Sequence, residues 1–226
     1  MSRVNGGNMN IFALSKCPEE SAEQMIDKHV VKMPTETCQM LHTNILYMYY
    51  VSEFNSEPSL KELKAFHKAI KSHLMKPAML NHPSTIWARE SLDNFNWLLA
   101  HGKALCEEYS FRYNKRHGSH DRIRDVDDYG KLLRSHNFPC EELTPVTIAM
   151  FDEYRIPNTH ANHCWEFVIE SYRHYYLEGK WRFAEWKKRE RPAWWPKFHF
   201  AKKYNVKARA WNATNPKYRM NIMKEE

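Results

Sequence analysis

Apolar residues recur every three or four positions over most of this 226-residue chain, and this helical period is what most limits its possible folds. The sequence holds six glycines, no internal repeat, and no pair of alternating segments joined by a short turn of the kind that makes a β-hairpin. The pattern therefore predicts an all-α fold. Helices are expected at about residues 15–30, 34–54, 59–76, 84–115, 119–135, 160–177 and 181–189, with an irregular stretch at 138–157 that holds one helical turn after Pro145.

Local signals set several of these helix ends. Ser15 is a suitable N-cap for the first helix, and Ser59 with Glu62 has the spacing of a capping box for the third. The pattern at 84–115 is the longest, and Gly102 within it allows close packing or a bend. A helix of that length would cross the molecule, so we expect it to form the spine of a helical bundle.

Length and composition exclude several classes of protein. The chain is long enough for one substantial core, or for one core with an appendage. It has no apolar run near the ~20 residues that span a bilayer and no apolar leader, so a soluble protein is expected. Its five cysteines never occur as Cys-x-x-Cys, which indicates neither a disulfide framework nor a cysteine zinc site and fits a reducing cytoplasm: Cys17, Cys38, Cys106, Cys140 and Cys164.

Positive charge is concentrated in the C-terminal part of the chain. From Gly179 onward there are fourteen Lys and Arg against four Glu, a balance of +10 against +7 for the whole chain, which leaves residues 1–178 at −3. Tryptophan, phenylalanine and tyrosine alternate with this charge, and basic side chains mixed with aromatic rings suit a partner with phosphates and flat bases. The alternative is a solvated basic surface over aromatic core residues.

The densest group of polar side chains lies between Asp27 and Gln39, in the sequence Asp-Lys-His-Val-Val-Lys-Met-Pro-Thr-Glu-Thr-Cys-Gln. Pro34 lacks the amide hydrogen that a helix interior needs, so it predicts a kink or a new helix start. Glu36 would then lie near a helix N-terminus. A carboxylate there is stabilised by the helix dipole and stays ionised unless burial opposes it.

The pattern Asp-Lys-His-x-x-Lys-x-x-x-Glu at residues 27–36 resembles the signature of the pyrimidine-dimer DNA glycosylase family, small all-helical phage and bacterial enzymes also called endonuclease V. Two later segments are similar to that family as well. Residues 81–87, Asn-His-Pro-Ser-Thr-Ile-Trp, resemble its His-Pro-to-Trp segment, and residues 191–195, Arg-Pro-Ala-Trp-Trp, resemble its C-terminal run. The three segments follow the family's order.

The resemblance implies that Glu36 is the catalytic acid. Breaking an N-glycosidic bond develops positive charge on the sugar and negative charge on the base, and a carboxylate can stabilise the first and relay a proton. His29 matches a position beside the family's site, where it would bind the flipped nucleotide, and Asp27 would orient it. The structural alternatives are a helix-capping Glu36 and a His29 that only satisfies the fold.

The family also uses the α-amino group of the mature N-terminus as a nucleophile, because an α-amine with a pKa near about 7.7–8.0 is partly unprotonated at neutral pH. Residues 1–8 are polar and aperiodic. Gly6-Gly7 is the pair that a ribosome-binding purine tract gives when it is translated, so Met9 is a candidate for the true first residue. Asn10 would oppose removal of Met9, whose own amine would then act. If residues 1–8 persist, Lys28 or Lys32 is the fallback nucleophile.

Polar, cationic and aromatic side chains near these motifs are candidates for DNA contact. For each lysine the alternative is a solvated helix face. Histidine and cysteine pairs such as Cys38 with His42 lack zinc-finger spacing, and no glycine-rich phosphate loop is present, so neither a metal nor a cofactor is expected. The candidate DNA-binding residues are Lys28, Lys32, Gln39, Arg89, Arg191, Trp194, Trp195 and Lys197.

Together these features predict a monomeric DNA repair glycosylase of the cytoplasm, or of the host cytoplasm if phage-encoded. It would kink double-stranded DNA, flip a nucleotide and act on cyclobutane pyrimidine dimers, with or without AP lyase strand cleavage. The expected division is a leader at 1–8, a single helical domain at 9–190 and a basic aromatic segment at 191–226. The alternatives are a glycosylase or modifying enzyme for another modified pyrimidine in DNA, and a non-catalytic DNA-binding protein on the same fold.

Overall fold

The computed structural model describes residues 10–130, 138–151, 154–157 and 163–195. Within these ranges the chain is all-α, with one isolated bridge between Ser91 and Cys140 and no strand, which confirms the predicted class. No helix among them is long and apolar enough to cross a membrane. The helices are α1 (Pro18–Glu23), α2 (Asp27–Phe54), α3 (Leu60–Ala69), α4 (Pro83–Glu90), α5 (Leu92–Tyr113), α6 (His120–Gly130) and α7 (Trp165–Tyr175), and α7 continues into a π-helical turn (Tyr176–Lys180) and a 3-10 turn (Trp181–Phe183).

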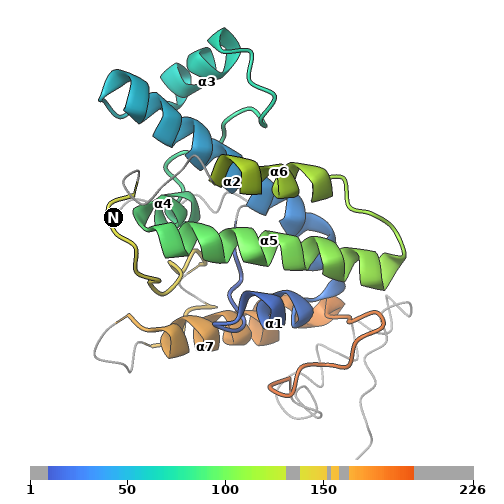
Figure 1. Ribbon diagram of the computed structural model, residues 1–226. Helices are drawn as coiled ribbons and strands as arrows, with labels where there is room; N and C mark the ends of the chain where they lie inside the picture. Colours follow the sequence, from blue (N-terminus) through green and yellow to red (C-terminus); the bar gives the residue numbers. More distant parts are fainter. Residues whose placement is uncertain (1–9, 131–137, 152–153, 158–162, 196–226) are drawn as a thin grey trace, which may run out of the picture.

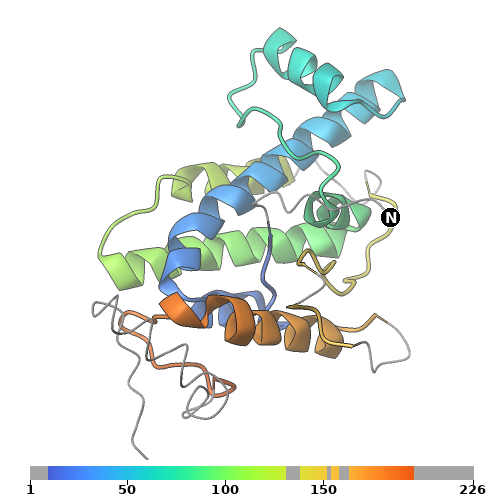
Figure 2. The same ribbon diagram turned by 180° about the vertical axis from the view of Figure 1, so that it is seen from behind.

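Helix α5 lies at the centre of the bundle (Figure 1). It packs against α1 on one side and against α4 and α6 on the other, while α2 crosses it obliquely. Seen from behind, α2 runs along the whole molecule from α1 to α3 (Figure 2). The last turns of α2 and the whole of α3 stand out from the rest of the bundle in both views.

The predicted helix start at Pro34 is wrong, because α2 continues through this residue without a break. Proline in a helix interior costs about 3 kcal/mol, mainly through one missing hydrogen bond and a steric clash. Residues on both sides of Pro34 are fully buried, among them Met33, Cys38 and Leu41, and their burial offsets that cost. Glu36 therefore lies in the third turn of a 28-residue helix and not at a helix N-terminus.

The predicted helix at 84–115 is divided at Ser91, whose backbone is extended (φ −147°, ψ 155°). The Ser91 hydroxyl accepts the amide hydrogen of Asn94 at 2.9 Å and so caps α5. The Leu92 amide donates to the carbonyl of Cys140 at 3.0 Å, so a distant segment holds the break in place. The longest described helix is therefore α2, although α5 does occupy the centre.

Other boundaries also differ from the prediction. The first helix begins at Pro18 with Cys17 as its N-cap, because the Ser15 hydroxyl instead binds Glu20 and the amide of Cys17. The helical turn predicted after Pro145 is not formed at residues 146–149. Residues 163–164 lie before α7 and outside any helix, although the helix is predicted to begin near residue 160. The helix predicted at 181–189 is only the 3-10 turn, and residues 184–189 after it are irregular. The start of the third helix is confirmed, with both bonds of the capping box between Ser59 and Glu62 present, but α3 ends at Ala69 and not just before Pro77.

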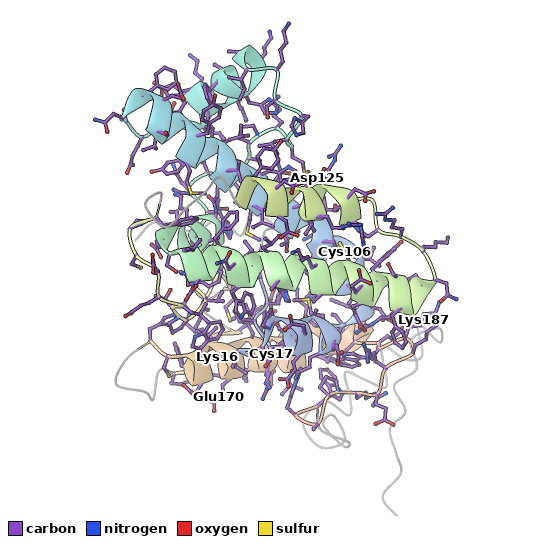
Figure 3. The ribbon with its side chains drawn as sticks, in the orientation of Figure 1. Lys16, Cys17, Cys106, Asp125, Glu170 and Lys187 are labelled. Atoms are coloured by element: carbon purple, nitrogen blue, oxygen red, sulfur yellow. The ribbon has the colours of Figure 1, made fainter. Side chains whose placement is uncertain are left out.

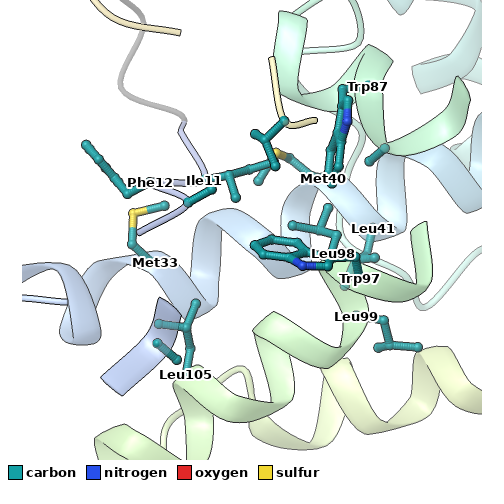
Figure 4. Packing of buried hydrophobic residues seen from close by; sticks show 14 of the residues in the cluster. Ile11, Phe12, Met33, Met40, Leu41, Trp87, Trp97, Leu98, Leu99 and Leu105 are labelled. Carbon is teal, nitrogen blue, oxygen red and sulfur yellow. The ribbon is translucent and has the colours of Figure 1, made fainter. Parts of the chain in front are cut away.

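A non-helical N-terminal segment is threaded into the core. Ile11, Phe12 and Leu14 are almost completely buried, with Phe12 in the left-handed region at φ 54°. Figure 4 shows Ile11 and Phe12 beside Met33 on α2, in the same core as Trp87 and the α5 side chains. The segment therefore brings the residues that follow Met9 against α2, where Glu36 lies.

Candidate active site

Glu36 projects from α2 into a largely buried setting. Its Oε1 is 2.5 Å from the ammonium nitrogen of Lys32, one helical turn earlier, and its side chain is 12% exposed. Its Oε2 accepts the backbone amide hydrogen of Asn10 at 3.1 Å. Burial raises the pKa of this carboxyl, while the hydrogen bond and charge of Lys32 and the Asn10 amide act in the opposite direction. Glu36 thus has its oxygens held by two donors.

Asn10 is fixed in place by its own side chain. Its Nδ2 donates to the carbonyl of Ala149 at 2.5 Å, and its Oδ1 accepts the Tyr172 hydroxyl at 2.8 Å. The residue is 7% exposed. The backbone nitrogen of Asn10 is the atom that faces Glu36. The linkage between residues 9 and 10 therefore lies at the carboxylate. Met9 itself lies outside the described residues.

His29 lies among aromatic rings, near the face of α2 that carries Glu36. Its Nδ1 is 2.6 Å from the Tyr176 hydroxyl, and its ring stacks on Phe12 at 4.1 Å between centroids. Burial, followed by the charges of Lys180 and Lys32, lowers the pKa of His29 to about 3. The imidazole is therefore neutral at physiological pH and serves as a hydrogen-bonding group.

Asp27 does not orient His29 as expected. Its carboxylate accepts Arg112 Nη1 at 2.8 Å and the Lys187 amide at 2.9 Å. Figure 3 shows Lys187 near the end of α5, where its ammonium lies 5.2 Å from the ring of Tyr113. Asp27 thus joins the first residue of α2 to α5 and to the segment after the 3-10 turn.

Arg112 is fully buried and forms the centre of an ionic network. Its Nε donates to Glu108 at 2.6 Å, and its Nη groups also donate to the backbone carbonyls of Glu23 and Met25. Arg189 donates to the other Glu108 oxygen at 2.7 Å. This network fixes the α1–α2 junction, and with it the helix turns that carry His29 and Glu36.

The predicted DNA-binding residues fall into three groups. Lys28 and Lys32 are exposed on α2, with the Lys28 ammonium 4.3 Å above the ring of Phe183. Gln39 and Arg89 take part in the fold, because Gln39 Nε2 donates to the Lys76 carbonyl at 2.6 Å and Arg89 Nη1 donates to the Leu80 carbonyl at 2.7 Å. The third group comes from the C-terminal part of the chain.

In that third group, Trp195 is 7% exposed and packs on Trp186 at 4.9 Å, and Trp194 Nε1 donates to Gln24 at 2.7 Å. The two tryptophans therefore have the core-packing role given above as the alternative. Arg191 lines an open pocket of about 440 Å³ together with Asp27, Arg182, Lys187 and Arg189. Lys197 lies outside the described residues.

The sequence did not single out Lys180 as a site residue. Its ammonium lies 4.6 Å from the Tyr175 ring centroid, and burial together with the charge of Lys32 lowers its pKa. Its place beside Lys32 depends on the π-helical turn that ends α7, and such turns are frequent at functional sites. Residue spacing alone does not reveal a π-turn. Asn10 was also missed, because only the fold brings it to Glu36.

Cys38 and His42, the pair considered above as possible metal ligands, are engaged in the fold. Within the described ranges no group of three or more His, Cys, Asp or Glu side chains is arranged for a metal ion. The Cys38 sulfur lies 3.7 Å from His42 Nε2, and that nitrogen also lies 3.1 Å from the Arg122 carbonyl, while Nδ1 accepts the Met75 amide. His42 thus connects α2 to two other segments.

A family model described as pyrimidine dimer DNA glycosylase matches residues 9–121, half of the chain. This chain belongs to that family. The matched region contains Asn10, His29, Lys32 and Glu36. No curated protein and no solved structure gave a match. At the level of the family, the chain is therefore a DNA repair glycosylase whose substrate is DNA.

Proposed function

We propose that this protein excises cyclobutane pyrimidine dimers from double-stranded DNA, with Glu36 as the catalytic carboxylate. The observation that carries the proposal is the Glu36 carboxylate itself, largely buried in the family-matched region and bonded both to Lys32 and to the amide of Asn10. A purely capping role is disfavoured, because Glu36 lies inside α2. Its environment supports a chemical role instead.

The first step is rupture of the bond between C1′ of the sugar and the pyrimidine nitrogen. The bonding electron pair leaves with the base, so positive charge develops at C1′ and its ring oxygen. A carboxylate held in place beforehand stabilises that charge without reorganising at the moment of reaction. Burial raises the pKa of Glu36, so the group is also suited to accept and return a proton.

An amine nucleophile would add strand cleavage. If the mature chain begins at Met9, its α-amine is one residue away from the amide nitrogen that Glu36 binds. The amine nitrogen would attack C1′ as the base leaves, and its proton would pass to Glu36. Glu36 returns that proton to the ring oxygen as the sugar opens, which gives an iminium ion at C1′. Loss of a C2′ proton with departure of the 3′ phosphate then breaks the strand.

DNA contact is assigned to side chains around this carboxylate and to the C-terminal part. Lys28 and Lys32 are exposed beside it, and Arg191 belongs to a pocket rich in cationic side chains. Phosphate contacts of this kind position a duplex without reading its sequence. His29, neutral and bonded to Tyr176, would support the wall of the site. We further propose that the protein acts as a monomer in the cytoplasm, without a cofactor.

The proposal is tested with a duplex that carries one dimer at a defined position. Incubation followed by alkali should release a fragment cut at the dimer and leave undamaged duplex intact. Release from a duplex with a different modified pyrimidine, and none from the dimer, would reassign the substrate. Binding without any product from either substrate would overturn the enzymatic assignment.

The lyase step has its own readout. Borohydride reduces an iminium ion, so it should trap the protein covalently on the dimer-containing strand. Mass spectrometry of the trapped peptide identifies the amine, with Met9 expected and Lys28 or Lys32 as the other outcomes. Base release without trapping would leave a glycosylase that lacks the lyase step.

A further inference from the structure

The surface of α3 that faces away from α2 carries an unusual run of positive charge. Residues 63–89 contain four lysines and one arginine and no Asp or Glu. Lys64, Lys68 and Lys71 are spaced by four and three residues, so they share one side of α3 and its C-terminal turn. They line an open groove of about 590 Å³ together with Lys76. We call this the basic groove, and its other lining residues are Ala65, His67 and Ser72.

The opposite side of α3 is apolar and holds the helix to α2. Leu63 is fully buried, and the Phe66 ring lies 5.2 Å from Tyr49, 5.4 Å from Tyr50 and 5.7 Å from Phe54. The helix is therefore fixed with the basic groove turned outward, on the part of the molecule that stands out in Figures 1 and 2.

The charges of the basic groove are not neutralised by any side chain in the described ranges. In the described part of the chain, the ammonium groups of Lys64, Lys68, Lys71 and Lys76 form no ion pair and no hydrogen bond. Lysines that only keep a protein soluble are commonly interspersed with acids. A one-sign surface of this kind attracts a polyanion instead.

Lys71 occupies a position that favours a different residue. It follows the C-cap of α3 with φ 49°, and the amides of Lys71 and Ser72 donate to the carbonyls of Lys68 and His67, which is a Schellman motif. Glycine is the preferred residue there, and α2 and α5 end on left-handed asparagines, Asn55 and Asn114. A lysine at this position is therefore less stable than a glycine would be.

The basic groove is connected to the candidate active site. Gln39 is one helical turn after Glu36 on α2, and its side chain binds the backbone of Lys76, which lines the groove. One side of α2 leads from the carboxylate to the basic groove. It is formed by Lys32, Glu36 and Gln39, which are all partly or fully exposed. One elongated ligand can therefore contact both.

We propose that the basic groove binds the phosphates of the duplex that flanks the lesion. The row from Lys64 to Lys71 extends about 10 Å along the helix. That length corresponds to about three phosphates of one DNA strand, which advance 3.4 Å each along the helix axis. This site rests on the proposed DNA substrate and extends the footprint beyond the lesion, along α2 to α3.

Salt dependence of binding to an undamaged duplex tests this site, because each phosphate contact contributes about 0.9 to the slope of log affinity against log salt concentration. Fluorescence anisotropy would compare the wild type with a variant carrying Lys64→Gln, Lys68→Gln and Lys71→Gln. The expected result is a slope smaller by about two to three. The matched control removes three positive charges elsewhere, with Lys16→Gln, Lys103→Gln and Arg124→Gln, and should have a smaller effect.

Two further variants separate charge from folding. Arginine at positions 64, 68 and 71 keeps the charge and should keep the slope. Lys71→Gly should raise the melting temperature, because glycine suits the left-handed position, and should still lower the slope by about one. A wild-type slope in the triple glutamine variant, or an equal change in the control, would overturn the proposal. Since no base is released in this assay, its result is independent of the glycosylase test.

Discussion

Arg112 gives the most direct test of how the site is held in place. Arg112→Met removes a fully buried guanidinium and four hydrogen bonds, two to the carboxylates of Asp27 and Glu108 and two to the carbonyls of Glu23 and Met25. Methionine fills much of the same volume. The loss therefore comes from the acceptors that remain buried without a donor.

Removing one partner of a buried ion pair costs about 3–5 kcal/mol, whereas replacing both partners by apolar residues can be neutral. Glu108 retains Arg189, and Asp27 retains the amide of Lys187. The expected loss is therefore at the lower end, about 3 kcal/mol. A domain has only about 5–15 kcal/mol of stability in total, so this loss is easily measured.

Urea unfolding followed by circular dichroism and tryptophan fluorescence measures the free energy difference by linear extrapolation. Arg124 is exposed on α6, so Arg124→Met is the control and should stay within about 0.5 kcal/mol of the wild type. Arg112→Lys keeps the charge but not the fork of donors and should be intermediate. A loss below about 1 kcal/mol for Arg112→Met would refute the assigned role of the network.

Three other perturbations follow from the site and its support. Lys32→Met removes an ammonium that lowers the pKa of Glu36, so the acid limb of the pH–rate profile should move to higher pH. Lys32→Arg should leave the acid limb in place. An unmoved acid limb in Lys32→Met would contradict the pairing of Lys32 with Glu36. The pKa of His29 in the folded protein is about 3, so NMR should show no titration of its ring between pH 5 and 8. The same histidine takes up a proton in the unfolded chain below about pH 6.5, so the stability of the folded protein should fall as the pH is lowered from there. A β-carbon at Gly102 would lie 2.8 Å from an α2 side chain, so Gly102→Ala should cost about 1–3 kcal/mol in urea unfolding, whereas Gly118→Ala, which meets open space, should be neutral.

Local patterns in the sequence predict much of the fold. The period of three to four predicts the all-α class, and the capping box at Ser59 and Glu62 predicts the start of α3 to the residue. The three segments that resemble the pyrimidine-dimer DNA glycosylase family, taken together, indicate the family before any geometry is known, and the family model confirms it. These features depend on residues close together in the chain, which is why spacing reveals them.

Features that depend on distant residues are not predictable in this way. Pro34 is tolerated because tertiary burial outweighs a local penalty, and the partners Asp27 and Arg112 are 85 residues apart. Asn10 reaches Glu36 across 26 residues because the N-terminal segment is threaded through the core. In each case packing, and not local propensity, decides the structure.

The measurement closest to the central claim is single-turnover base release by Glu36→Gln on a duplex with one pyrimidine dimer. Glutamine keeps the size of the side chain but removes the negative charge that would stabilise C1′. We expect the rate to fall by at least about 100-fold while DNA affinity is retained. Base release at the wild-type rate in a folded Glu36→Gln variant would contradict the assignment of Glu36 as the catalytic carboxylate.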